Sequence, residues 1–197
     1  MNIQPQRAAV LALHWQVNVI RPEGFFGAML AEPVARSGVV GRAARFHAEA
    51  GIPVYFTRFT IPEGEGRLVR NTGFMRAVGD AQEAFRPEAP GTQLIPEMAQ
   101  GARTVDNQKL SGLAGNDLAS ELSGQGVDTL FVTGVATNLT VEQTARHGTD
   151  LGFVVHTVAD CVTAAEEEVH AASLDNLDLA TAGCLSAEEV LARLTSG

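Results

Sequence analysis

The segment GVDTLFVTG, residues 126–134, is the clearest buried strand in the chain. Its centre is apolar and rich in β-branched and aromatic residues, and a glycine stands at each end. This pattern is typical of a strand that is covered on both faces. Such strands belong to parallel sheets, in which a helix usually follows each strand. The segment therefore predicts an α/β fold.

On both sides of this segment, short apolar runs alternate with amphipathic stretches. The other expected strands are 8–13, 52–59, 102–105, 153–158 and 184–185. The expected helices are 32–50, 116–123, 138–150, 164–182 and the final stretch that begins at 186. Asn116 and Thr137 are candidate helix caps, and Ser186 with Glu189 has the form of a capping box. We expect one domain, residues 1–197, with a Rossmann-like three-layer fold in which helices flank a central, mainly parallel sheet.

Residues 60–101 are rich in proline and glycine and show no clear periodicity. They predict a long irregular region with about one helical turn. Long irregular segments inside a compact domain often build binding sites.

Composition narrows the classes of partner. The chain has 197 residues and a net charge of −9, which argues against a nucleic-acid binder because such proteins need clustered cations. The apolar run 8–13 is too short for a signal-peptide core or a membrane span. Two cysteines, Cys161 and Cys184, have neither disulfide-framework nor metal-type spacing, which favours a reducing, cytoplasmic location. The net charge says little about small-molecule substrates, because they respond to the local charge of a site.

The fold class also predicts where a ligand binds. In parallel α/β sheets, ligands bind beyond the carboxyl ends of the strands. We therefore expect the site among residues 14–18, 105–113 and 134–141.

The stretch GVDTLFVTGVATNLTVEQTARHGTDLGFVVHTVADCVTA, residues 126–164, resembles the most characteristic segment of the isochorismatase-like, or cysteine-hydrolase, superfamily. LALHWQ, 11–16, resembles the family's first strand, which normally ends in Asp-x-Gln. LSGLAGNDLASEL, 110–122, is similar to a further family segment. The resemblance covers nearly the whole chain and implies a hydrolase of small molecules that acts on C–N or related bonds.

This sequence departs from the family at the catalytic positions, where the family has Asp, Lys and Cys. The position of the Asp holds His14, and that of the Cys holds Thr140. Family spacing puts Asn107 at the position of the Lys, but Lys109 lies two residues away, and a local shift could bring it to the site. Which of the two stands there is left open.

The residues present suggest a modified mechanism. His14 could act as general base toward Thr140 or a water molecule, while Asn107 or Lys109 orients it or the substrate. The resemblance also implies an oxyanion hole formed by the backbone N–H groups of Ala136 and Thr140. Alternatively, His14 could be a hydrogen-bonded, half-buried residue, Thr140 a helix cap and Lys109 a solvated loop residue.

Five further residues are candidates for substrate binding, namely Trp15, Phe25, Phe26, Leu113 and Asn138. The three aromatic residues could equally pack in the core, and Asn138 could cap a helix.

We expect neither a metal nor another cofactor. Metal-dependent, nicotinamidase-like relatives carry Asp-x-His and a further His after the second strand. Here residues 54–64 read VYFTRFTIPEG and contain no His or Asp. The resemblance also implies a homo-oligomer, a dimer or a tetramer, paired through helices next to the site.

Three functions remain open. The first is hydrolysis of an amide, ester or enol-ether type bond with His14 as acid/base. The second is a non-catalytic descendant that binds a ligand or partner, because the family's Asp and Cys are both absent. The third is an isomerase or lyase that uses His14 for proton transfer.

Overall fold

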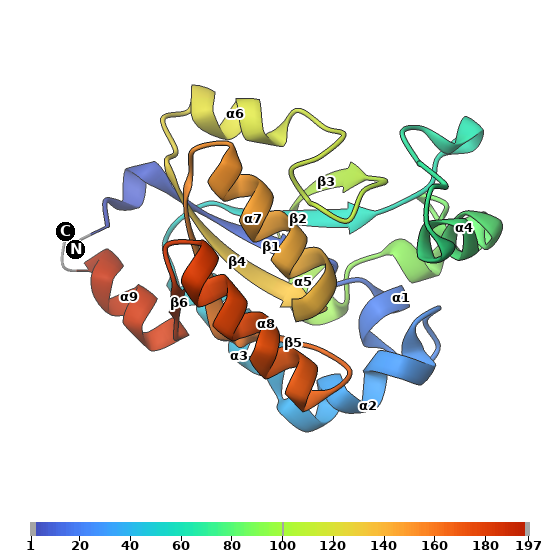
Figure 1. Ribbon diagram of the computed structural model, residues 1–197, viewed down its shortest axis with the longest axis horizontal. Coiled ribbons are helices and arrows are strands. Elements are labelled where there is room, and N and C mark those ends of the chain that lie inside the picture. The colour runs from blue at the N-terminus through green and yellow to red at the C-terminus, as the bar shows by residue number, and fades with distance from the viewer. Residues whose placement is uncertain (1–2, 100, 196–197) are drawn as a thin grey trace.

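The computed structural model describes residues 3–99 and 101–195, which form one six-stranded, all-parallel sheet flanked by helices (Figure 1). The order of the strands in the sheet is β3-β2-β1-β4-β5-β6. The strands are β1 Ala8–Leu13, β2 Val54–Phe59, β3 Arg103–Asn107, β4 Thr129–Val135, β5 Val154–Thr163 and β6 Cys184–Leu185. The prediction of an α/β fold with a parallel central sheet is confirmed.

Residues of β1 alternate between two cores. Val10 and Ala12 belong to the core on one face of the sheet, and Ala9, Leu11 and Leu13 belong to the core on the other. Because successive side chains of a strand point to opposite faces, a strand covered on both sides is apolar throughout.

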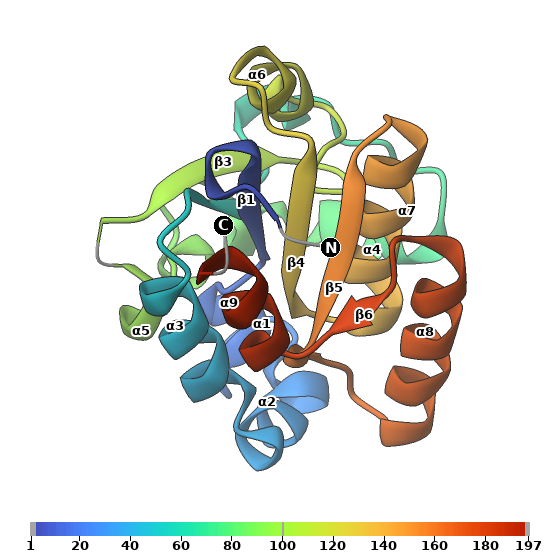
Figure 2. The ribbon, with the colours of Figure 1, turned by 90° about the vertical axis from the view of Figure 1, so that its left-hand side faces the viewer.

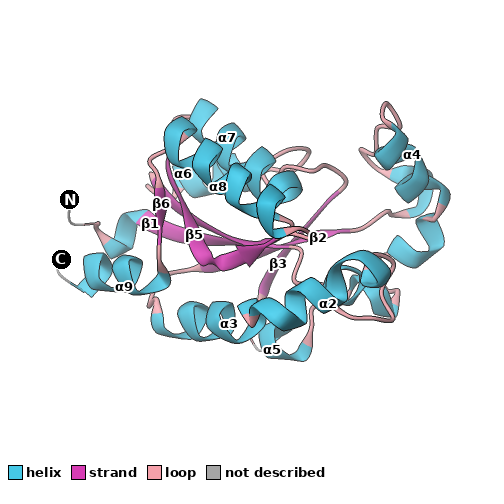
Figure 3. Cartoon of the chain, turned by 60° about the horizontal axis from the view of Figure 1, so that its bottom comes forward, coloured by secondary structure: helices cyan, strands magenta, loops and turns pink. Residues whose placement is uncertain are grey.

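Helices cover both faces of the sheet and complete the three layers. Helices α6, α7 and α8 lie on one face, and α2, α3, α5 and α9 lie on the other (Figure 3). Figure 2 shows α3 and α9 across the sheet from α7 and α8. The helices are α1 Val17–Ile20, α2 Gly27–Ser37, α3 Val39–Glu49, α4 Gly73–Asp80, α5 Pro96–Ala99, α6 Leu118–Gly124, α7 Glu142–Asp150, α8 Glu167–Ala180 and α9 Ala187–Thr195. No helix in the described ranges is long and apolar enough to cross a membrane.

The predicted helix 32–50 is wrong in one respect, since it is two helices that meet at Gly38. This glycine has φ 66° and ends α2 in the left-handed conformation. Glycine adopts that conformation without the steric cost that a Cβ brings.

The observed boundaries of other elements also differ from the predicted ones. The predicted cap Thr137 instead begins a π-helix, Thr137–Val141, which leads into α7, and its hydroxyl hydrogen-bonds to His170 Nδ1 at 2.8 Å. Strand β5 continues five residues beyond the predicted end at 158. Asn116 Oδ1 accepts a hydrogen bond from the Leu118 N–H at the start of α6, as predicted.

The capping box at the start of α9 is confirmed. The Glu189 N–H donates to Ser186 Oγ at 3.1 Å, and the Ser186 N–H donates to Glu189 Oε2 at 2.8 Å. These bonds satisfy two donors that the first turn of a helix would otherwise leave unpaired.

Residues 60–101 contain more regular structure than the sequence predicts. They include α4, α5 and three short 3₁₀ turns. Phe59, Ile61, Met75, Val78 and Phe85 form a small core under this segment. The segment is thus a subdomain-like cover with its own packing, and the prediction of about one helical turn was wrong.

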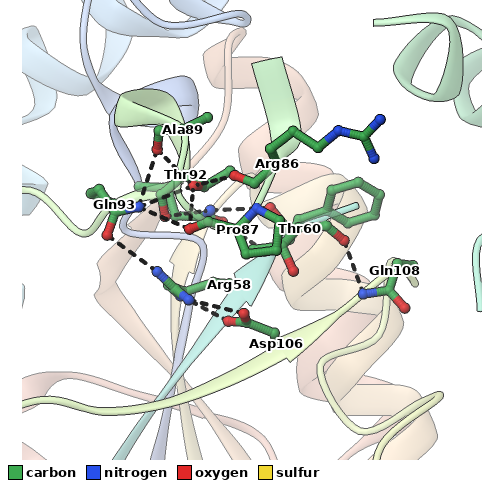
Figure 4. A network of polar contacts seen from close by, with 11 residues as sticks. Arg58, Thr60, Arg86, Pro87, Ala89, Thr92, Gln93, Asp106 and Gln108 are labelled. Atoms are coloured by element: carbon green, nitrogen blue, oxygen red, sulfur yellow. Dashed lines mark hydrogen bonds and ion pairs between the residues drawn. The ribbon is translucent and has the colours of Figure 1, made fainter. Parts of the chain in front are cut away.

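Polar contacts fasten this cover to the sheet. The Gln16 side chain accepts the Phe59 N–H at 2.7 Å and donates to the carbonyls of Phe59 and Thr92 at 3.1 and 2.9 Å. Figure 4 shows further contacts in this network, including the Arg58–Asp106 ion pair at 2.7 Å and the bond from Gln108 Nε2 to the Thr60 carbonyl. The cover is therefore held at the carboxyl ends of β1, β2 and β3.

Candidate active site

The strand order places a crevice between β1 and β4. These two strands pair with each other in the middle of the sheet, and the chain leaves β1 toward β2 but leaves β4 toward β5. Connections that diverge in this way leave a crevice beyond the carboxyl ends of the two strands. His14 directly follows β1, and Ala136 and Thr140 follow β4.

A cavity of about 50 Å³ occupies this crevice. His14 and Thr140 both line it, together with Ala136, so the structure brings these three predicted residues to one place. Two other polar residues, Gln16 and Asn18, line it as well. The other side chains that line it are apolar. They include four aromatic rings, those of Phe26, Phe59, Phe74 and Phe85.

His14 is buried in an uncommon backbone conformation. Its φ is 56°, its backbone N–H donates to the Thr57 carbonyl at 3.1 Å, and only 4% of its surface is exposed. Among the described residues, the imidazole has no hydrogen-bond partner, and its Nε2 is fully buried. Burial lowers the pKa of His14 from 6.5 to about 4, because desolvation disfavours the charged ring. The ring is therefore neutral near pH 7 and can accept a proton.

Thr140 lies in the π-helical turn that leads into α7. Its hydroxyl donates to the Val135 carbonyl at 3.2 Å. The hydroxyl proton is thus committed to a backbone group and not to His14. The two side chains share the cavity but do not hydrogen-bond to each other.

Ala136 has a backbone amide that could serve an oxyanion. Within the described ranges, no group accepts a hydrogen bond from its N–H. The residue lies on the cavity wall directly before the π-helical turn. A donor without a partner at such a wall can bind a developing negative charge.

Neither candidate for the lysine position lines this cavity. Asn107 is fully buried at the end of β3, where its Nδ2 donates to the Ser111 carbonyl at 2.7 Å. Lys109 lies in a separate cleft beside Ser111 and α7. Leu110, the residue after Lys109, is the residue of this loop that lines the cavity.

Of the five candidates for substrate binding, Phe26 alone lines the cavity. Trp15 and Leu113 are buried in the cores on opposite faces of the sheet, where their apolar area packs against helices. Phe25 is 42% exposed and packs edge-on against Phe26. Asn138 is exposed in the first turn after β4.

The sequence analysis missed several wall residues. Gln16 and Asn18 lie in the predicted segment 14–18, and their type alone could have marked them as polar groups at a strand end. Phe74 and Phe85 come from the segment that the sequence left irregular. No local pattern relates them to His14, because tertiary packing of the cover brings them there.

The two cysteines do not supply a reactive thiol to the cavity. Burial raises the pKa of Cys161 to about 12 and that of Cys184 to about 11. Neither lines the cavity. A group of three or more His, Cys, Asp or Glu side chains suited to a metal is absent from the part of the chain that the structure describes.

The sequence model of the isochorismatase domain matches residues 8–189. The chain belongs to the isochorismatase family. Two proteins of similar sequence illustrate the relationship. The uncharacterized isochorismatase family protein YecD of Escherichia coli is 38% identical over 170 residues, which cover 81% of this chain and 82% of YecD. Nicotinamidase 3 of Arabidopsis thaliana is 31% identical over 131 residues, which cover 65% of this chain and 64% of that protein.

Solved structures show the same fold. A cysteine hydrolase from Pseudomonas syringae pv. phaseolicola superimposes with a TM-score of 0.83 at 23% identity, covering 100% of this chain and 96% of that one. In this member of the isochorismatase family, the family's fold therefore surrounds a cavity that holds His14 and Thr140.

Proposed function

We propose that this isochorismatase-family protein is a hydrolase of small molecules, acting on an amide, ester or enol-ether type bond, with His14 as the acid/base. One observation carries the proposal. The neutral imidazole of His14, which follows β1, and the hydroxyl of Thr140, which lies in the turn after β4, line one cavity. The backbone N–H of Ala136, which has no partner among the described residues, lies at the same wall.

Water is the nucleophile that suits this arrangement. The Thr140 hydroxyl donates its hydrogen bond to the Val135 carbonyl, so its oxygen can accept a hydrogen bond from a water molecule. His14 takes a proton from that water as the water oxygen bonds to the substrate carbon, and it then returns the proton to the leaving group. The Ala136 N–H binds the negative charge that develops on the substrate oxygen.

The test is a turnover screen of amides, esters and vinyl ethers with the wild type, followed by the His14→Ala and Thr140→Val variants on any compound that reacts. Loss of the base should lower kcat by about 10²- to 10⁴-fold while circular dichroism stays native. His156→Gln is the matched control, because His156 pairs with Phe131 in the sheet, away from the cavity. Unchanged turnover in His14→Ala would refute the proposal.

A second candidate function is ligand binding without catalysis. The observation that favours it is the unanchored His14 ring, since general bases are usually oriented by a third group and neither Asn107 nor Lys109 reaches it. This function predicts compounds that raise the Tm but are never turned over. The screen above separates the two functions when each compound is also tested by thermal unfolding.

A further inference from the structure

Three of the four polar side chains that line the cavity already form hydrogen bonds within the protein. Both ends of the Asn18 amide are bonded, with Nδ2 donating to the Ala84 carbonyl at 2.7 Å and Oδ1 accepting the Phe25 N–H at 3.2 Å. The Gln16 amide is bonded to Phe59 and Thr92, and the Thr140 hydroxyl to Val135. His14 is therefore the one polar lining side chain without a partner among the described residues.

No charged side chain of the described chain lines the cavity. His14 is neutral near pH 7, because its pKa is about 4. Lys109, the only lysine in the sequence, lines a different cleft together with Arg146. Leu110 contributes to the walls of both spaces and thus stands between the cation and the cavity.

Aromatic rings form much of the wall that remains. The rings of Phe26 and Phe74 stack with their centroids 5.8 Å apart at an interplanar angle of 10°. Phe59 and Phe85 meet edge-on at 5.7 Å. Flat apolar groups gain both burial and ring contacts from such surroundings.

We propose that this cavity accepts an uncharged compound with a flat apolar group and rejects the corresponding carboxylate. A carboxylate that enters loses its hydration and meets no cation in return. The start of the helical turn at Thr137 offers a partial positive charge of only about half an elementary charge, which does not neutralise the full charge of a bound carboxylate.

This preference has a consequence that rests on the proposed function. Hydrolysis of an amide breaks the C–N bond, forms a C–O bond to water and yields a carboxylate and an ammonium ion, R–CO–NH₂ + H₂O → R–COO⁻ + NH₄⁺. A neutral substrate thereby becomes an anion inside a cavity that has no cation for it. The reaction itself then lowers the affinity for the product and promotes its release.

The rim can admit a ligand larger than the 50 Å³ cavity. Phe74 is 37% exposed and Met29 is 47% exposed, and both line the cavity. Exposed side chains change rotamer on the picosecond to nanosecond timescale. Rotation of Phe74 away from Phe26 would widen the cavity without moving a strand.

The experiment compares benzamide with benzoate, which have nearly the same shape and differ in charge. Isothermal titration calorimetry at pH 7.5 should show benzamide binding to the wild type at least about tenfold more tightly than benzoate. Leu110→Lys places a cation on the wall and should shift the ratio at least about tenfold toward benzoate. Leu110→Met keeps the apolar wall and should leave the ratio unchanged, as should Lys109→Ala.

Equal or tighter binding of benzoate by the wild type would overturn the inference, and so would the absence of benzamide binding. The comparison in the wild type stands even if Leu110→Lys does not fold. Benzamide that binds but is not hydrolysed supports the preference for neutral ligands and counts against the proposed hydrolase. Turnover of an amide together with tight inhibition by its carboxylate product would support the proposed hydrolase and contradict the preference for neutral ligands.

Discussion

At the scale of single residues, His14 combines two features that cost stability. A positive φ costs a residue with a Cβ roughly 1–2 kcal/mol, and a buried polar atom without a hydrogen bond adds a desolvation penalty. Strain and unsatisfied groups of this kind are concentrated at functional sites, where surrounding structure compensates for them. The combination at a cavity wall therefore supports the proposed role of His14 in the site.

Burial of His14 also makes stability depend on pH. The unfolded ring binds a proton near pH 6.5, but the folded ring stays neutral until about pH 4. The free energy of unfolding should thus be full above pH 6.5, fall as the pH drops from 6.5 to 4, and level off below that. A shift of this size corresponds to at most roughly 3 kcal/mol.

The prediction is that His14→Gln makes this decline shallower, because one of the groups responsible is removed. His47, whose pKa burial also lowers to about 4, should give a similar reduction as His47→Gln. Urea unfolding between pH 7.5 and 4.5 measures both. Identical pH profiles for the wild type and the two variants would contradict the prediction.

The sequence located part of the site because family spacing and strand ends fix those positions. His14 and Ala136 directly follow buried strands, and Thr140 lies in the short helical turn after β4. The end of a strand determines where the next residues lie. Lys109 and Asn107 could not be placed in the same way. Asn107 is the last residue of the edge strand β3, and Lys109 lies in the loop after it, where Leu110 and not Lys109 lines the cavity.

At the scale of elements, local chemistry predicted some boundaries and missed others. The Ser186–Glu189 box was readable because both partners of each bond lie within one turn. The break at Gly38 was missed because apolar periodicity continues through it. A glycine in a helical pattern does not reveal whether its φ is negative or positive.

Two glycines three residues apart in this region give a matched test. Gly38→Ala forces a Cβ into a left-handed residue at φ 66° and should destabilise the protein by about 1 kcal/mol. Gly41 lies inside α3, and a Cβ added there meets no atom within 4 Å. Gly41→Ala should therefore stabilise the protein by about 0.5–1 kcal/mol. Chemical denaturation measures both, and effects of the same sign would show that the break between α2 and α3 is not set by Gly38.

At the scale of the whole molecule, the alternation of strands and helices predicted the layers but not the cavity. Apolar strands report that a sheet is covered, and this signal is local. The cavity walls depend on how residues 60–95 fold back over the strand ends, and that arrangement rests on a few buried polar contacts far apart in sequence. Gln16 is the most connected of these residues, since its amide joins the end of β2 to the cover at Thr92.

Gln16→Leu should therefore loosen the cover and leave the sheet intact. The variant keeps an apolar side chain of similar size but leaves the Phe59 N–H and the carbonyls of Phe59 and Thr92 without their partner. Unpaired buried groups cost about 1–3 kcal/mol each, so we expect a loss of about 3 kcal/mol or more. Hydrogen exchange should accelerate at the Phe59 amide and through residues 60–95, while β4 and β5 keep their protection. Gln93→Ala is the control for this prediction. The Gln93 side chain also donates a hydrogen bond within the cover, to the Pro87 carbonyl, but from an exposed position, so its loss should lower the free energy of unfolding by less than about 1 kcal/mol. Uniform acceleration across β4 and β5 in Gln16→Leu would instead mean that cover and sheet unfold as one unit.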